Sequence, residues 1–159
     1  MIGLKESNII SYFDIDDFES VIKQIKDMGY KIYYIDGKRT NTIEKLFIWI
    51  KDTFPLDPPL SGKVNLDAFV DSFWGGLYEQ KYEKVSIVWR YPNELVKQDE
   101  NMFYKLLECI KDIAKGITSG EYGVDKSVIL KTLLFDSGTM PSKLMDSIKD
   151  VENKLNIKS

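Results

Sequence analysis

The sequence predicts an α/β fold, with a small three-stranded parallel sheet, helical crossovers, and extra helices at the N- and C-terminal ends. Three short runs rich in β-branched and aromatic residues are the expected strands, at 31–35, 84–90 and 128–135. Apolar residues recur at helical spacing between these runs. Strands that alternate with helices usually join as parallel crossovers. The length of 159 residues is enough for one such domain with its own core.

The first helix and the first strand are predicted near the N-terminus. Asp16 and Glu19 have the spacing of a capping box, with Asp in place of Ser, and Gly29 follows where the helix should end. The apolar residues between them fall at helical spacing: Phe18, Val21, Ile22 and Ile25. Lys31–Ile35 then reads as a strand, closed by the turn residues Asp36-Gly37.

A second helix is predicted from Thr42 to about Thr53, with Ile43, Leu46, Phe47 and Ile50 on one face. The segment 54–62 holds three of the five prolines, at positions 55, 58 and 59. Proline is excluded from helix interiors, so this segment is predicted to be an irregular loop that leads to Asn65.

The stretch 65–76 is predicted to be the helix around which the chain is organised. Asn65 is a good N-cap, and Gly75 and Gly76 are of the type that helix ends favour. At about 100° per residue, one face is apolar and suited to burial. That face comprises Leu66, Phe69, Val70, Phe73 and Leu77. A narrower stripe carries Asp67, Asp71, Trp74 and Tyr78.

The acidic stripe allows two interpretations. Carboxylates at i, i+4 repel by roughly 0.2–0.5 kcal/mol, and the helix dipole offsets this for Asp67 but not for Asp71. The stripe is either an ordinary exposed face with Trp74 tucked under a loop, or an acidic docking surface for a basic partner.

The C-terminal half continues the alternation. Lys84–Arg90 fits a buried parallel strand. A short helix should run from Pro92 to about Lys97, and a second, capped by Asp99, should end at Gly116. The third strand is expected at 128–135, where a helix is the alternative.

Residues 137–141 read as a break, so we expect a domain at 1–136 and a helical extension at 137–159. The extension has an apolar stripe at Leu144, Ile148, Val151 and Leu155. This stripe either docks on the same domain or contacts a partner.

Composition excludes several function classes. The chain has 22 basic and 25 acidic residues, a net charge of −3, which disfavours direct nucleic-acid binding. It has no histidine, which removes the commonest general base and the usual zinc ligand. Cys109 is the single cysteine, so no internal disulfide forms. With no apolar signal core or membrane-spanning run, we expect a cytoplasmic protein, monomeric, without cofactor or metal.

The order of elements and several motifs together resemble the barstar family, small bacterial intracellular inhibitors of ribonucleases such as barnase. The most specific segment is Asn65–Asp71, N-L-D-A-F-V-D, near a glycine. The supporting segments are Phe13–Asp17, Gly29-Tyr30, Tyr34–Gly37, Phe54-Pro55, Gly62 and Val85–Trp89. Val70 stands where family members often have tryptophan, and Pro59–Ser61 stand where they usually have aromatic residues.

The resemblance implies a non-catalytic inhibitor, or toxin immunity protein, whose acidic helix blocks the active site of a nuclease. It assigns partner contacts to Asn65, Asp67, Asp71 and Gly75, to which the stripe and the glycine pair add Trp74 and Gly76. A further acidic contact from the long helix after Asp99 falls to Glu108 or Asp112, which the sequence does not separate because both neighbour Lys111.

Two other function classes remain open at this point. The first is a regulatory interaction module on the same fold with a non-nuclease partner, favoured by the altered loop at 58–61 and by the C-terminal helix. The second is an enzyme that uses Asp67 and Asp71 as a metal or acid–base pair, although no third ligand accompanies them.

Overall fold

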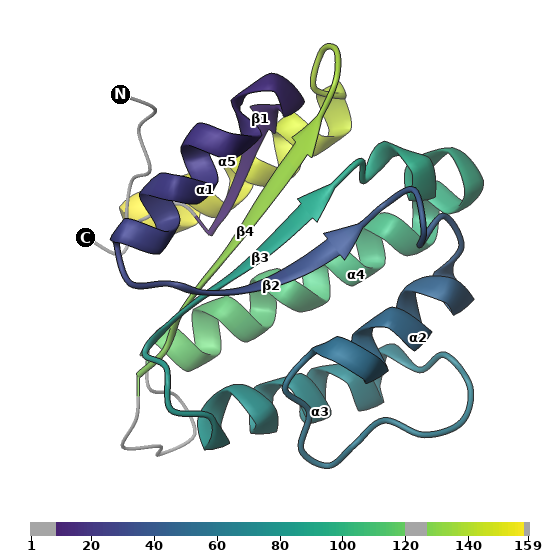
Figure 1. Ribbon diagram of the computed structural model, residues 1–159, viewed down its shortest axis with the longest axis vertical. Helices are drawn as coiled ribbons and strands as arrows, with labels where there is room; N and C mark the ends of the chain where they lie inside the picture. The colour runs from purple at the N-terminus through teal and green to yellow at the C-terminus, as the bar shows by residue number, and fades with distance from the viewer. Residues whose placement is uncertain (1–8, 120–126, 158–159) are drawn as a thin grey trace.

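The computed structural model describes residues 9–119 and 127–157, which form a parallel sheet with helices on both faces (Figure 1). The sheet has four strands in the order β1-β4-β3-β2, all parallel. They span Ile10–Asp14 (β1), Lys31–Asp36 (β2), Lys84–Arg90 (β3) and Ile129–Asp136 (β4). The three expected strands are confirmed, and the alternative of a helix at 128–135 is wrong.

The prediction of three strands is itself wrong, because β1 adds a fourth. This strand pairs with β4 in a register that runs from Ile10 opposite Thr132 to Asp14 opposite Asp136. Ile10, Tyr12 and Phe13 are of strand-favouring types, but the run is only five residues long and only Ile10 is buried. The extended conformation depends on pairing with a strand more than a hundred residues later, which no local pattern reveals.

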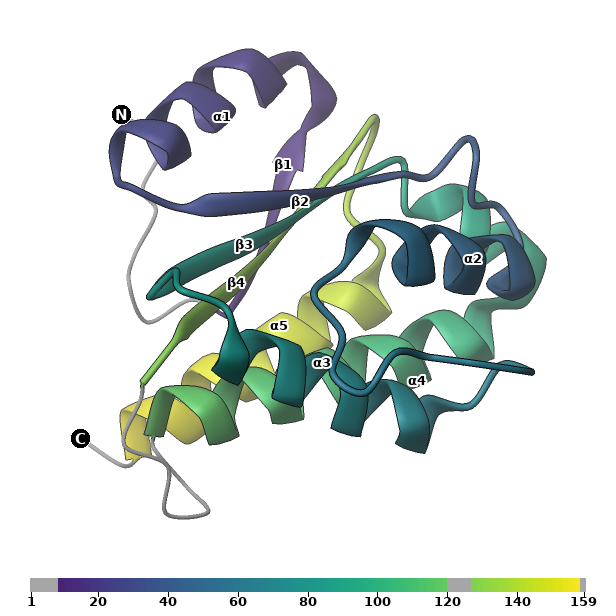
Figure 2. The same ribbon diagram turned by 60° about the horizontal axis from the view of Figure 1, so that its bottom comes forward.

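The two faces of the sheet are covered differently. One face carries α1 (Phe18–Asp27), preceded by the 3-10 turn η1 (Ile15–Asp17). The other carries α2 (Ile43–Thr53), α3 (Leu66–Glu79), α4 (Asn93–Ser119) and α5 (Ser142–Ile157), as Figure 2 shows. On the α1 face a small core forms from Val21, Ile22, Ile25, Tyr30, Val88, Leu133 and Phe135. The larger core lies on the opposite face.

Capping residues in the sequence predicted most helix starts correctly. The Thr42 hydroxyl accepts the Lys45 N–H at 3.2 Å and caps α2. Within α4 the backbone kinks at Asp99 (φ −155°, ψ 77°), whose Oδ1 accepts the Met102 N–H at 3.2 Å. This is the predicted cap between a short and a long helix. The long part continues to Ser119, however, so its predicted end at Gly116 is wrong.

The C-terminal helix α5 lies beside α4 (Figures 1 and 2). Its Leu144 is 2% exposed and belongs to the main core, and Ile148 packs against that core. The side chains of Val151 and Leu155, the rest of the predicted stripe, lie outside the described residues. Among the helices the structure describes, none has the length and apolar character needed to cross a membrane.

Candidate functional site

Helix α3 is anchored rigidly, and this anchoring fixes which of its residues face outward. Asn65 caps the helix as predicted, its side-chain oxygen accepting the Ala68 N–H at 3.1 Å. Phe69, Phe73 and Leu77 are fully buried in the core. A helix pinned by three large apolar side chains presents its opposite face with little freedom to rotate.

The glycine pair does not end α3, which runs on to Glu79, so the predicted end at Gly75-Gly76 is wrong. The two glycines instead let the proline-containing loop approach the helix. A Cβ on Gly75 would collide with the Asp57 carbonyl oxygen, and one on Gly76 with the Pro55 carbonyl. The Asp57 N–H also donates to the Ser72 carbonyl at 2.8 Å. The glycines therefore fix the loop on the helix, and Gly76 is itself buried.

The two aspartates of the acidic stripe are exposed. Neither Asp67 nor Asp71 makes an ion pair or a side-chain hydrogen bond within the part of the chain that the structure describes. Trp74 is half-buried and stacks on Tyr78, with ring centroids 5.9 Å apart and planes at 11°. The stripe therefore combines free carboxylates with an aromatic surface held in place.

A hollow of about 400 Å³ opens between α3 and α4. Its lining residues are Val70, Asp71 and Trp74 from α3 and Asp112, Ile113 and Gly116 from α4. Apolar walls thus meet two carboxylates in one depression, and both carboxylate residues are exposed. Asn65, Asp67 and the glycine pair lie on the same helix but are not among the lining residues.

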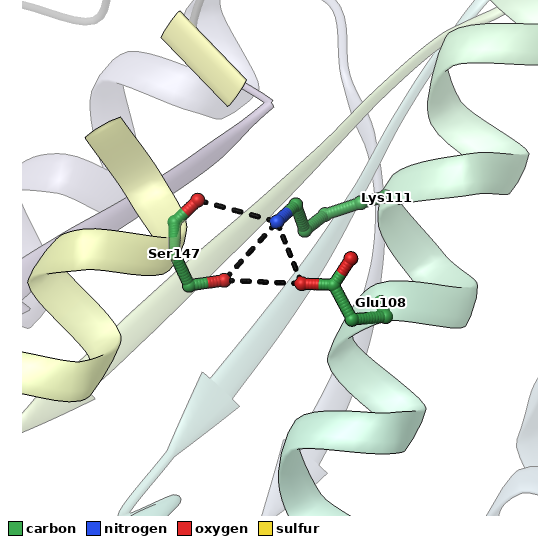
Figure 3. Close-up of polar contacts among 3 residues, drawn as sticks. All are labelled: Glu108, Lys111 and Ser147. Atoms are coloured by element: carbon green, nitrogen blue, oxygen red, sulfur yellow. Dashed lines mark hydrogen bonds and ion pairs between the residues drawn. The ribbon is translucent and has the colours of Figure 1, made fainter. Parts of the chain in front are cut away.

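The structure separates the two acids of α4 that the sequence left undecided. Glu108 accepts a 2.7 Å hydrogen bond from the Lys111 ammonium, which also donates to the Ser147 carbonyl and hydroxyl at 3.2 and 3.1 Å (Figure 3). Lys111 is only 1% exposed, so its charge is held in the contact between α4 and α5. Asp112 lines the hollow instead. It is the additional acidic residue of the candidate site.

Cys109, a half-buried residue of α4, feels the negative charge of this surface. Burial raises the pKa of its thiol, and the nearby carboxylates of Asp112, Asp67 and Glu108 raise it further. Carboxylates from both helices therefore act on one group, which places the Asp67 and Asp112 charges in a common field. The raised pKa makes Cys109 a poor nucleophile at neutral pH.

Within the described residues no group of three or more carboxylate or thiol side chains is arranged to hold a metal ion. The site presents negative charge, an aromatic ring and a depression on a stiff helix pair. These features are complementary in charge and shape to a cationic protein surface.

Comparison with known proteins identifies the family of the chain. Residues 30–131 match the family described as Barstar (barnase inhibitor), so the chain belongs to the barstar family. No curated protein matches the sequence. The matched region begins at Tyr30, just before β2, and ends inside β4. It contains all of α3, while β1, α1 and α5 lie outside it.

Proposed function

We propose that this protein is a non-catalytic inhibitor that blocks the active site of a basic ribonuclease with the acidic surface of α3 and α4. The observation that carries the proposal is the pair of exposed carboxylates, Asp67 and Asp71, on a rigid helix with no cation of the described chain paired to them. Family membership over residues 30–131 supports the same function.

A ribonuclease cleft holds RNA phosphates with lysine and arginine side chains, so it presents positive charge. Carboxylates on a fixed helix can occupy the phosphate positions without first losing conformational freedom. Opposite charges also accelerate the encounter, and this acceleration falls as salt rises. Trp74 and Tyr78 add aromatic area of the kind that anchors protein interfaces.

The test is inhibition of RNA cleavage by barnase and by other basic bacterial ribonucleases of its class. The titration is run at low and high salt with the wild-type protein, with Asp71→Ala, and with Asp52→Ala. Asp52 is an exposed carboxylate on α2 and controls for the loss of one negative charge.

We expect one-to-one inhibition that weakens with salt, is lost in Asp71→Ala and is retained in Asp52→Ala. If none of the ribonucleases is inhibited, the proposal is overturned. A non-nuclease partner bound through the same face would then replace it.

A further inference from the structure

Strand β2 borders the sheet, because the order β1-β4-β3-β2 puts β3 on one side of it and no strand of the described residues on the other (Figure 1). Its sequence is K-I-Y-Y-I-D, so the residues between Lys31 and Asp36 are all apolar or aromatic. Tyr34 is 37% exposed. An edge strand without charge or proline in its middle readily pairs with another chain, and proteins usually protect such an edge.

Two hydrogen bonds show which backbone groups of β2 point away from the sheet. The Gly37 N–H donates to the Arg90 carbonyl of β3 at 2.7 Å, so the odd-numbered residues direct their backbone groups inward. The Trp49 indole N–H donates to the Tyr34 carbonyl at 2.7 Å, which is an outward group. The N–H and C=O of one strand residue point the same way, so Ile32 and Tyr34 present both groups at the open edge.

Trp49 protects this edge. The residue comes from α2, is half-buried and packs against the main core, so its indole is held beside β2. Within the part of the chain that the structure describes, no other group bonds to the outward backbone groups of Ile32 and Tyr34. The indole N–H therefore takes the position that a donor of an added strand would need.

We propose that Trp49 protects a self-complementary edge, and that two copies of this chain pair through antiparallel β2 strands once the indole is removed. The proposal goes beyond the proposed function, because it concerns a sheet edge outside the α3–α4 surface. In an antiparallel pair, residues that lie opposite each other both face the pair or both face away from it. Outward residues of β2 must therefore meet outward residues of the second copy.

One register suits the backbone groups. With Ile32 opposite Tyr34 of the second copy, the N–H and C=O groups of both residues are paired on each chain. If Tyr34 lay opposite its own copy, Ile32 would lie opposite Asp36, whose carbonyl already accepts the Thr40 hydroxyl at 2.9 Å. If Ile32 lay opposite its own copy, Tyr34 would lie opposite Tyr30, whose N–H is already bonded to a carbonyl of α1.

The side chains suit the same register. Ile32 packs on the α1 side of the sheet and Tyr34 points to that side by alternation, so each would contact the other across the pair. Aromatic and β-branched side chains are favourable cross-strand pairs. Tyr33 would meet its own copy at the two-fold axis, and Lys31 would meet Ile35, so no like charges are directly opposed. Half of the bonds in this register need the Tyr34 carbonyl, which is the group that the indole occupies.

Sedimentation velocity over a range of protein concentrations tests the proposal on wild type, Trp49→Phe and Trp49→Leu. The phenylalanine keeps an aromatic ring on the core and removes the N–H donor, and the leucine also opens space at the edge. We expect wild type to stay monomeric and both variants to dimerise at least about tenfold more tightly, because half of the edge bonds become available. Ile48→Ala, at a neighbouring exposed position of α2, is the matched control and should stay monomeric.

Either of two outcomes would overturn the proposal. In one, the folded variants are as monomeric as wild type. In the other, wild type dimerises as strongly as they do. If Trp49→Leu does not fold, Trp49→Phe alone decides between these results.

The register is tested by cross-linking in a Trp49→Phe, Cys109→Ala background, which has no other cysteine. Tyr33→Cys should give a disulfide-linked dimer on oxidation, because opposite residues at a non-hydrogen-bonded position have Cα atoms about 4.5 Å apart. Lys31→Cys is the matched control, since its two copies would lie roughly 13 Å apart along the strands. A dimer that does not cross-link at position 33, or that cross-links equally at both positions, would overturn the proposed pairing.

Discussion

Helix α4 has an acidic residue near α5 and another near α3, and only the one near α5 is paired to a cation. Toward α5, Glu108 is bonded to the buried ammonium of Lys111, which Ser147 also holds. Toward α3, Asp112 shares a hollow with Asp71, and no cation of the described chain is paired to either. Two carboxylates one helical turn apart therefore serve different purposes, one in holding the fold together and one in facing outward.

This difference between the α5 side and the α3 side of α4 indicates which side suits a basic partner. A carboxylate already paired to a buried lysine gains little from a second cation, because its charge is largely compensated. The unpaired carboxylates of the α3–α4 surface keep their full attraction for a basic protein. The contact with α5 also keeps Lys111 away from the α3 side, so it does not neutralise the surface.

The largest effect is expected from Asp71→Ala on binding to an inhibited ribonuclease. Truncating one partner of a desolvated charge pair costs about 2–5 kcal/mol of binding free energy. We expect the dissociation constant to rise by at least about thirtyfold, with the free energy of unfolding nearly unchanged because Asp71 is exposed. The matched variant Glu108→Ala should bind within about twofold of wild type. Equal losses of affinity in the two variants would contradict the difference between the two sides of α4.

The next effect concerns stability on the α5 side. Glu108→Ala leaves the Lys111 ammonium buried with only Ser147 as acceptor, and we expect a loss of about 1–3 kcal/mol in the free energy of unfolding. Glu108 is 57% exposed, so the loss should stay below that of a fully buried pair.

Lys111→Met replaces the buried charge by an apolar chain of similar length, and we expect a smaller loss, below about 1 kcal/mol. Urea unfolding of the two variants compares them directly. A larger loss of unfolding free energy for Lys111→Met than for Glu108→Ala would contradict this order. It would show that the buried ammonium itself stabilises the contact between α4 and α5.

A smaller effect is expected from Asp112→Asn on binding to the same ribonuclease. The substitution keeps the shape of the side chain and removes one of the two carboxylates in the hollow. We expect about a five- to tenfold rise in the dissociation constant, less than a buried hydrogen bond to a charged group contributes, because Asp112 is exposed. The titration used for Asp71→Ala measures it. No change in affinity would place Asp112 outside the contact.

The smallest effect is on the reactivity of Cys109. Burial and three carboxylates raise the pKa of its thiol, so a maleimide should label it more slowly than an open cysteine at pH 8. Asp112→Asn should lower this pKa and speed labelling by less than about fivefold. Labelling that does not change in this variant would contradict the common field of the two helices.

The same raised pKa has a consequence for stability. The unfolded chain gives up the thiol proton first, so the contribution of Cys109 is complete below the ordinary thiol pKa. It is lost as pH rises through the raised value. The free energy of unfolding of wild type should therefore fall relative to that of Cys109→Ala between neutral and alkaline pH, and urea unfolding of both proteins at the two pH values measures this fall.

Sequence alone predicted the parts of the molecule that depend on local signals. The caps at Asn65 and Asp99 and the apolar spacing of α1 and α2 lie within single elements, where residue type and period suffice. It missed β1, whose strand conformation depends on β4 far along the chain. It also ended α3 at the glycine pair, because only the fold shows that a loop needs those glycines.

The candidate site shows the same limit. The spacing of Asp67, Asp71 and Trp74 was readable from the sequence, since all three lie on one helix. The separation of Asp112 from Glu108 was not, because it depends on how α4 is rotated between α3 and α5. The hollow likewise arises only where two helices meet at Val70 and Gly116.

The most direct test of the central claim is hydrogen exchange of the protein alone and in complex with an inhibited ribonuclease. The blocking surface predicts slower exchange at residues 66–78 of α3 and 109–116 of α4, and unchanged exchange at 142–149 of α5. Slower exchange in α5 or α1, with α3 unaffected, would contradict it.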